Sequence, residues 1–192
     1  MNGADKATTM LAGKPLLQHI ITRVRPQVDD LLINANGDAS RFAGFGCEVV
    51  ADGMADFPGP LAGILAGLYW TRQNRPDADW VVSCACDCPF VPLDMVGRLL
   101  DAAKRANVPI AVAASGARHH PVVAAWRSDL PLDPNDILRT RGMRKVDDVI
   151  ENFANVRVEF SAEPLDPFFN INTPQDLSRA EELIMEGAKS DA

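Results

Sequence analysis

The sequence predicts an α/β protein with a Rossmann-like three-layer sandwich, in which helices cover both faces of a mostly parallel sheet. Two observations carry this prediction. Short apolar runs alternate with amphipathic segments of about 10–15 residues, the pattern of strands joined by crossover helices. The run from Trp80 to Cys86 is apolar almost throughout, as is typical of a parallel strand covered on both faces. A chain of 192 residues is most simply one domain, and we expect residues 1–192 to form a single unit.

The N-terminal half alternates helix-forming and strand-forming patterns. Its predicted helices carry apolar residues at helical spacing behind a proline, which is favoured in a first helical turn, and span residues 11–25 and 60–74. Its predicted strands are apolar runs bounded by turn residues, and span residues 30–34, 47–51 and 80–89. The last of these strands stops at Pro89, because proline cannot extend a central ladder.

The C-terminal half continues the alternation with less regularity. Its predicted helices span residues 93–106, 137–153 and 173–186. Its predicted strands span residues 108–114, 122–126 and 156–160. We expect the first two of these strands to be joined across residues 115–121. Thr173 is a good N-cap for the final helix, and Asp176 lies in the acidic first turn that helices favour.

Composition excludes several classes of function. A net charge of −7 and a pI near 4.9 argue against a nucleic-acid or an anionic membrane partner. No apolar run reaches the ~20 residues of a transmembrane helix, and the first residues lack the layout of a signal peptide. The four cysteines are Cys47, Cys84, Cys86 and Cys88. The last three lack the usual zinc spacing, and their pattern favours burial as small apolar residues. We therefore expect a cytoplasmic location.

Polar residues close three of the predicted strands, and these residues are Asn34, Asp52 and Asp87. The carboxyl ends of parallel strands meet at one edge of the sheet, where ligands bind. A carboxylate there suits Mg²⁺, which prefers hard oxygen ligands and shares them with substrate phosphates. The alternative is that each residue starts a turn, or that Asp87 caps the next helix. Gly59 and Gly63 lie in a Gly/Pro-rich stretch near the same edge and allow close approach of a ligand or a neighbouring element.

Several motifs then resemble one family, the molybdenum cofactor guanylyltransferases. The resemblance is carried by DFPGPLAG at residues 56–63, CDCP at residues 86–89 and FNINTPQDL at residues 169–177. Shorter matches occur in the same order at Asp5-Lys6, residues 13–17, 34–36 and 49–52, so the resemblance spans essentially the whole chain.

The resemblance implies a nucleotidyltransferase that moves GMP from GTP to Mo-molybdopterin, giving the guanine dinucleotide cofactor and pyrophosphate. It assigns catalytic roles to Lys6 and Asp87, with Asp87 as the Mg²⁺ ligand and Lys6 at the triphosphate. Asn34 and Asp52 match nucleotide-binding positions. Asn170 and Asn172 match the family's positions beside the metal and the acceptor phosphate, and Gly59 and Gly63 are expected at the substrate. Partners for delivery would be a molybdoenzyme or a chaperone.

The family's phosphate-binding loop, LAGGxSxRMG, is matched only at its end, by residues 1–6. The resemblance therefore implies a sheet without the family's usual first strand. We expect Met1 to be an internal residue of a longer product. The alternative is a catalytically impaired homologue that binds molybdopterin or a partner protein. A relative that uses CTP or acts on a sugar phosphate also stays open.

Overall fold

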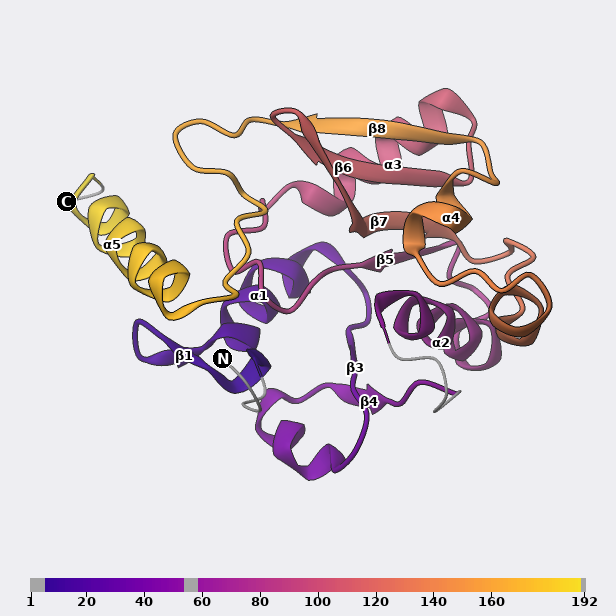
Figure 1. Ribbon diagram of the computed structural model, residues 1–192, viewed down its shortest axis with the longest axis horizontal. Coiled ribbons are helices and arrows are strands. Elements are labelled where there is room, and N and C mark those ends of the chain that lie inside the picture. The colour runs from indigo at the N-terminus through magenta and orange to yellow at the C-terminus, as the bar shows by residue number, and fades with distance from the viewer. Residues whose placement is uncertain (1–5, 54–58, 191–192) are drawn as a thin grey trace.

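The computed structural model describes residues 6–53 and 59–190 (Figure 1). Its strands are β1 (Met10–Leu11), β2 (Lys14–Pro15), β3 (Leu32–Asn34), β4 (Glu48–Val50), β5 (Trp80–Ser83), β6 (Ile110–Ser115), β7 (Arg118–Arg127) and β8 (Asn155–Phe160). Its α-helices are α1 (Leu16–Val24), α2 (Pro60–Asn74), α3 (Met95–Ala106), α4 (Val146–Ile150) and α5 (Pro174–Ser190). Shorter helical turns cover Lys6–Thr8, Arg25–Gln27, Ala39–Phe45 and Asp136–Thr140.

The main sheet has four strands in the order β5-β7-β6-β8. Because β7 is antiparallel to both β5 and β6, and β6 is parallel to β8, three of the four strands point the same way. The parallel pair β3–β4 forms a separate hydrogen-bonded unit among the described residues, and β1–β2 is a small antiparallel hairpin.

The α/β class predicted from the sequence is confirmed, but the pairing is more antiparallel than expected. β6 and β7 are joined by the turn Gly116-Ala117, and Gly116 has a φ of +57°. A turn this short can only reverse the chain, whereas parallel neighbours need a long crossover. β7 therefore folds back between β5 and β6. Among the described residues, the expected mostly parallel sheet is divided into this four-stranded sheet and the β3–β4 pair.

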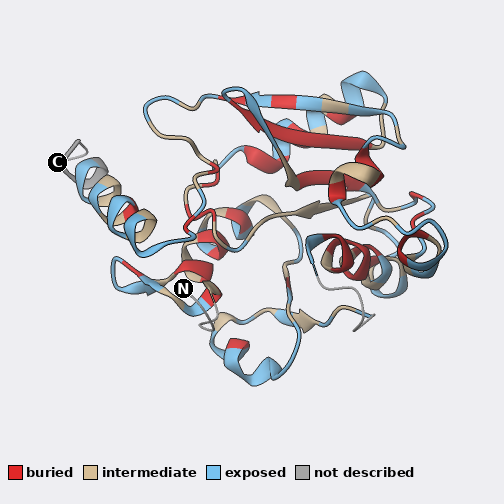
Figure 2. Ribbon diagram, viewed as in Figure 1, coloured by how far each residue is buried: buried red, intermediate tan, exposed pale blue. Residues whose placement is uncertain are grey.

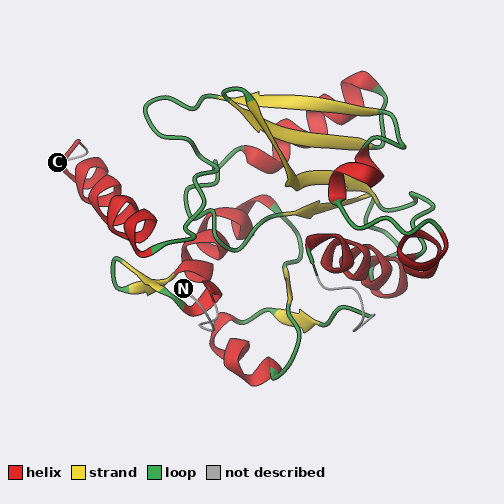
Figure 3. Cartoon of the chain, in the orientation of Figure 1, coloured by secondary structure: helices red, strands yellow, loops and turns green. Residues whose placement is uncertain are grey.

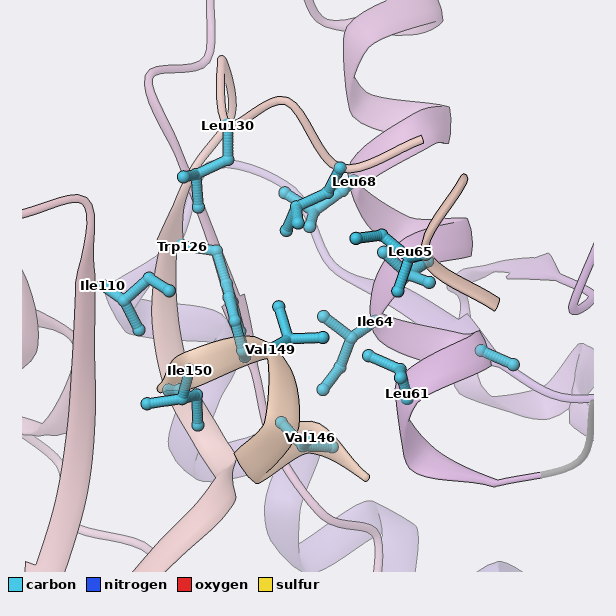
Figure 4. Close-up of a cluster of buried hydrophobic side chains, with 14 of the residues drawn as sticks. Leu61, Ile64, Leu65, Leu68, Ile110, Trp126, Leu130, Val146, Val149 and Ile150 are labelled. Carbon is cyan, nitrogen blue, oxygen red and sulfur yellow. The ribbon is translucent and has the colours of Figure 1, made fainter. Parts of the chain in front are cut away.

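Alternate residues of β6 and β7 face two different apolar cores, which makes the sheet the middle layer. On one face, Val112, Ala124 and Trp126 pack with α2 and α4. Figure 4 shows this cluster, with the leucines of α2 and the short α4 around Trp126. On the other face, Ala111 and Ala125 pack with α1 and α3. Figure 2 shows the resulting band of buried residues along β6 and β7, as expected for strands covered on both sides.

The predicted strand 80–89 is wrong beyond Ser83, where β5 ends. Ser83 pairs with Ala124, and the pairing of β6 with β7 skips from Ala124 to His120 at a bulge. The bulged residues include Pro121, which has no N–H to donate. β7 thus stops supporting β5 at this point, and residues 84–94 form a loop (Figure 3).

The predicted helix 137–153 is also wrong, because the chain forms a π-helical turn at Asp136–Thr140 and the separate α4 instead. Gly142 between them has a φ of +66°, a left-handed conformation that ends helices. Within the described residues, no helix is both long and apolar enough to cross a membrane.

Candidate functional site

Three segments distant in the sequence meet at Lys6. Lys6 opens the first helical turn, and its Nζ lies 3.4 Å from Oδ2 of Asp87 in the loop after β5. The same ammonium group donates to Oδ1 of Asn172, in the loop between β8 and α5. The side chain of Asp87 is only 16% exposed, whereas that of Lys6 is 37% exposed. A partly buried ion pair is less screened than a surface pair, so the charges of Lys6 and Asp87 orient one another.

The loop after β5 and the loop after β8 lie against each other (Figure 3). The N–H of Ile171 donates to the carbonyl of Asp87 at 2.9 Å. The buried thiol of Cys88 lies 2.8 Å from Oδ1 of Asn170 and donates to it. Burial raises the pKa of this thiol, which keeps the proton that the hydrogen bond needs. Asn170 and Asn172 are thereby held beside Asp87.

A capping box holds Asn172 at the N-terminus of α5. Oδ2 of Asp176 accepts from the backbone N–H of Asn172 at 3.0 Å and from that of Thr173 at 2.8 Å. The Thr173 hydroxyl accepts from the N–H of Asp176 at 3.1 Å. These donors, the Asn172 N–H first, lower the pKa of Asp176. The reciprocal pattern is the one that Thr-x-x-Asp predicts, so the N-cap expected at Thr173 has its hydrogen bonds in place.

A second polar group lies at the ends of β3 and β4. The amide of Asn34 donates to Oδ1 of Asp52 at 2.9 Å and to the carbonyl of Val50 at 3.0 Å. Asn36 donates to Oδ2 of Asp52 at 2.7 Å and accepts from its backbone N–H at 2.9 Å. Asp52 thus has both carboxylate oxygens engaged. The sequence did not single out Asn36 as a site residue, although its place two residues after Asn34 was a usable signal.

Gly59 and Gly63 lie at the start of α2, and each position requires glycine for a different structural reason. A Cβ at Gly63 would lie 2.2 Å from Oδ1 of Asn34, so only glycine lets the helix approach this side chain. Gly59 precedes Pro60 at the start of the helix and has a φ of +134°, which other residues rarely adopt. Residues 56–58 of the same motif lie outside the described residues.

The structure therefore sorts the predicted residues into two groups. Lys6, Asp87, Asn170 and Asn172 form the first, and Asn34, Asp52 and Gly63 the second. Among the described residues, no hydrogen bond or ion pair joins the two groups. Cys88 was predicted only as a small apolar residue, and nothing in the sequence signals its contact with Asn170.

Comparison with known proteins identifies the chain. The family described as "MobA-like NTP transferase domain" matches residues 1–156. A molybdenum cofactor guanylyltransferase of Rhodopseudomonas palustris strain BisB5 is 47% identical over 189 residues, covering 98% of this chain and 90% of the relative. The chain belongs to the molybdenum cofactor guanylyltransferase family. A family member from Shewanella baltica strain OS155 is 39% identical and covers 98% of this chain and 91% of its own length. The resemblance drawn from the motifs is confirmed.

Solved structures show that the fold is that of this family. Molybdopterin-guanine dinucleotide biosynthesis protein A from Archaeoglobus fulgidus superposes with a TM-score of 0.74 at 24% identity, over 96% of this chain and 92% of its own. The 2-C-methyl-D-erythritol 4-phosphate cytidylyltransferase from Thermus thermophilus gives 0.68 at 21% identity, over 94% of each chain. At these identities the likeness establishes a nucleotidyltransferase-type fold for the family member described here, and not its substrate.

Proposed function

We propose that this protein transfers GMP from GTP to Mo-molybdopterin, forming the guanine dinucleotide cofactor and pyrophosphate. The observation that carries the proposal is the convergence of Lys6, Asp87 and Asn172 on one point, in a chain whose relatives of almost full length are named molybdenum cofactor guanylyltransferases. A cation and oxygen ligands gathered from three segments distant in the sequence suit the binding of a triphosphate better than a purely structural role.

The reaction requires little proton transfer by the protein. The terminal phosphate of the acceptor has a second pKa of ~6, so near neutral pH it is already a nucleophile. Its oxygen forms a bond to the α-phosphorus of GTP, the bond from that phosphorus to the α–β bridging oxygen breaks, and pyrophosphate leaves with the electron pair. The site must therefore supply alignment and positive charge. Lys6 supplies charge directly, and its flexible stem allows it to exchange Asp87 for a phosphate oxygen.

The oxygen atoms near Lys6 also fit a magnesium ion. Asp87 Oδ2 and Asn172 Oδ1 both accept from one ammonium group, so they converge within reach of a single cation. The described residues contain no group of three or more His, Cys, Asp or Glu that could hold a metal, and Mg²⁺ commonly binds through one or two carboxylates together with substrate phosphates. Bound there, Mg²⁺ would neutralise charge at the α-phosphate. Asp87 is the residue that would hold it, with Asn170 and Asn172 beside the acceptor phosphate.

The second group is proposed to bind the nucleoside part of GTP. Asn34 and Asp52 are held rigidly against each other at 2.9 Å, and Gly63 brings α2 against them. An amide and a carboxylate in fixed positions suit the donors and acceptors of a base or ribose. Gly59 would allow the same backbone to approach the substrate closely.

The test measures pyrophosphate release with Mo-molybdopterin, Mg²⁺ and either GTP or CTP. We expect release with GTP, and tighter binding of GTP than of CTP by calorimetry. Asp87→Asn should lower the rate about 10²–10³-fold, the usual loss when a group that organises charge at the reacting centre is removed. Asp94→Asn is the matched control, because Asp94 ends the same loop and its exposed carboxylate forms a surface ion pair with Arg98 at 3.9 Å. Absence of GTP-dependent release, or preference for CTP, would overturn the proposal.

A further inference from the structure

A partly buried polar cluster, formed around the buried Ser115, lies outside the residues assigned above. Ser115 at the end of β6 is only 2% exposed, and its Oγ lies 2.8 Å from Oδ1 of Asp166 and 2.8 Å from Nε2 of His120. Ser115 therefore connects the β6–β7 hairpin to the loop after β8. Buried polar groups are costly unless they are fully paired, so this arrangement needs an explanation.

The proton count excludes a nucleophilic triad. A serine hydroxyl has one proton, and here Ser115 donates it to Asp166. Nε2 of His120 must then donate to Ser115, which places serine, rather than histidine, in the middle. Burial lowers the pKa of His120, and the neutral ring can carry its proton on Nε2 as this order requires. The order His120 to Ser115 to Asp166 leaves the carboxylate as the final acceptor.

Asp166 also forms a hydrogen bond within the loop that carries Asn170 and Asn172. Its Oδ1 also accepts from the backbone N–H of Phe168 at 2.9 Å. The ring of Phe168 is buried, with its centroid 4.7 Å from that of His120 and an edge-on contact at 5.2 Å to Phe160. The carbonyl of Phe168 lies 3.7 Å from the thiol of Cys88. Phe168 is thus held from both sides, directly before the segment that contacts Asp87.

We propose that Asp166, fixed by Ser115 and His120, is a positioning residue that holds residues 168–172 in register, so that Asn170 and Asn172 face Asp87. The inference rests on the proposed function for its effect on turnover. Downstream, Asp176 fixes the same segment at the start of α5, so Asp166 supplies the second fixed end. A reacting group displaced by about 1 Å loses on the order of 10²-fold in rate.

The experiment compares Asp166→Ala with Asp166→Asn, whose amide oxygen can still accept from Ser115 and Phe168. Asp166→Ala should lower kcat about 10–100-fold, with the Kd for GTP within about twofold of the parent value. Asp166→Asn should restore kcat to within about threefold. Asp133→Ala is the matched control: Asp133 also accepts from two backbone N–H groups, those of Asn135 and Asp136, but none of these bonds involves residues 161–173. It should leave kcat unchanged.

A double-mutant cycle separates positioning from general loss of structure. Because Asp166 acts through Asn170 and Asn172, adding Asp166→Ala to a variant that already carries Asn170→Ala and Asn172→Ala should cost less than about threefold more, far less than in the parent protein. Equal losses in both backgrounds would overturn the proposal.

Hydrogen exchange tests the same claim without turnover. Asp166→Ala should speed amide exchange at residues 168–172 at least about tenfold, with the core strands unchanged, and Asp133→Ala should not. If the parent protein releases no pyrophosphate, the proposed function fails, and exchange alone decides the positioning role. Unchanged exchange at these amides would overturn that role.

Discussion

Replacing Gly63 with alanine tests how the nucleotide-side group is built. A Cβ at this position would lie 2.2 Å from Oδ1 of Asn34 and 2.9 Å from its Cγ, closer than non-bonded atoms can approach. Asn34 must therefore rotate away. Its amide would then lose the hydrogen bonds to the Val50 carbonyl at 3.0 Å and to Asp52 at 2.9 Å.

The expected change in the free energy of unfolding combines two destabilising contributions with one stabilising contribution. Asn34 is exposed, so its two hydrogen bonds contribute only about 0.5 kcal/mol each. Forcing the side chain aside costs about 1–2 kcal/mol, the lower part of the range for overpacking. Alanine in place of glycine in a helix interior stabilises by about 1 kcal/mol. We expect a net loss of about 1–2 kcal/mol in the free energy of unfolding, and GTP affinity reduced about tenfold because Asn34 no longer meets Asp52.

Urea denaturation and calorimetry with GTP measure the two effects. Gly67→Ala is the control, since Gly67 lies one turn further along α2 and a Cβ there has no atom within 4 Å. It should stabilise the protein by up to about 1 kcal/mol and leave GTP affinity unchanged. In an Asn34→Ala background the clash disappears, and Gly63→Ala should become stabilising. The reasoning is refuted if Gly63→Ala in the parent protein stabilises as Gly67→Ala does and binds GTP normally.

Two further predictions concern stability and thiol reactivity. The guanidinium of Arg72 donates to three carbonyls in the segment 128–132, at 2.7 Å to Ser128, 3.5 Å to Leu132 and a short contact to Leu130. Arg72→Met should lower the free energy of unfolding by about 2–4 kcal/mol. Hydrogen bonds from a charged donor contribute about 1.5–3 kcal/mol each, and their contributions are not additive. A loss below about 1 kcal/mol in urea titrations would contradict this prediction. Burial raises the pKa of the Cys84 thiol to about 12, so at pH 8 only about one molecule in ten thousand is thiolate there, against about one in ten for an unperturbed thiol. Iodoacetamide labelling of Cys84, followed by tandem mass spectrometry, should therefore rise about tenfold per pH unit from pH 7 to 10 without a plateau. Labelling of the folded protein at the rate of a free thiol would contradict the raised pKa.

Local sequence patterns correctly predicted the first and last residues of some elements. The helix expected at 60–74 is α2 (Pro60–Asn74), because a proline start and a continuous apolar face are both local signals. The end of β5 was not predictable in this way. It depends on the bulge in β7, about forty residues away, and no pattern within residues 80–89 encodes that partner. The broken helix at 136–150 depends in part on the left-handed Gly142, whose conformation the sequence only permits.

The candidate site likewise has one part that local patterns predicted and one part that depends on distant contacts. Asn34 and Asp52 are adjacent because they lie at the carboxyl ends of two paired parallel strands, as strand ends predict. Asp87 meets Lys6 for a different reason, since it lies in a loop beyond β5 that is held by residues from the loop after β8. The family resemblance placed Lys6, Asn170 and Asn172 near Asp87, but no local pattern predicted the contacts that hold these loops together.

By itself, the sequence determined the α/β class, the family and the set of polar residues from which a site is built, because residue type, periodicity and motif spacing are local properties of the chain. Only the tertiary structure decided that β7 runs between β5 and β6, that Gly63 is required by Asn34, and that Ser115, His120 and Asp166 hold the loop bearing Asn170 and Asn172. Each of these depends on contacts between residues distant along the chain, and such contacts form only when the layers pack.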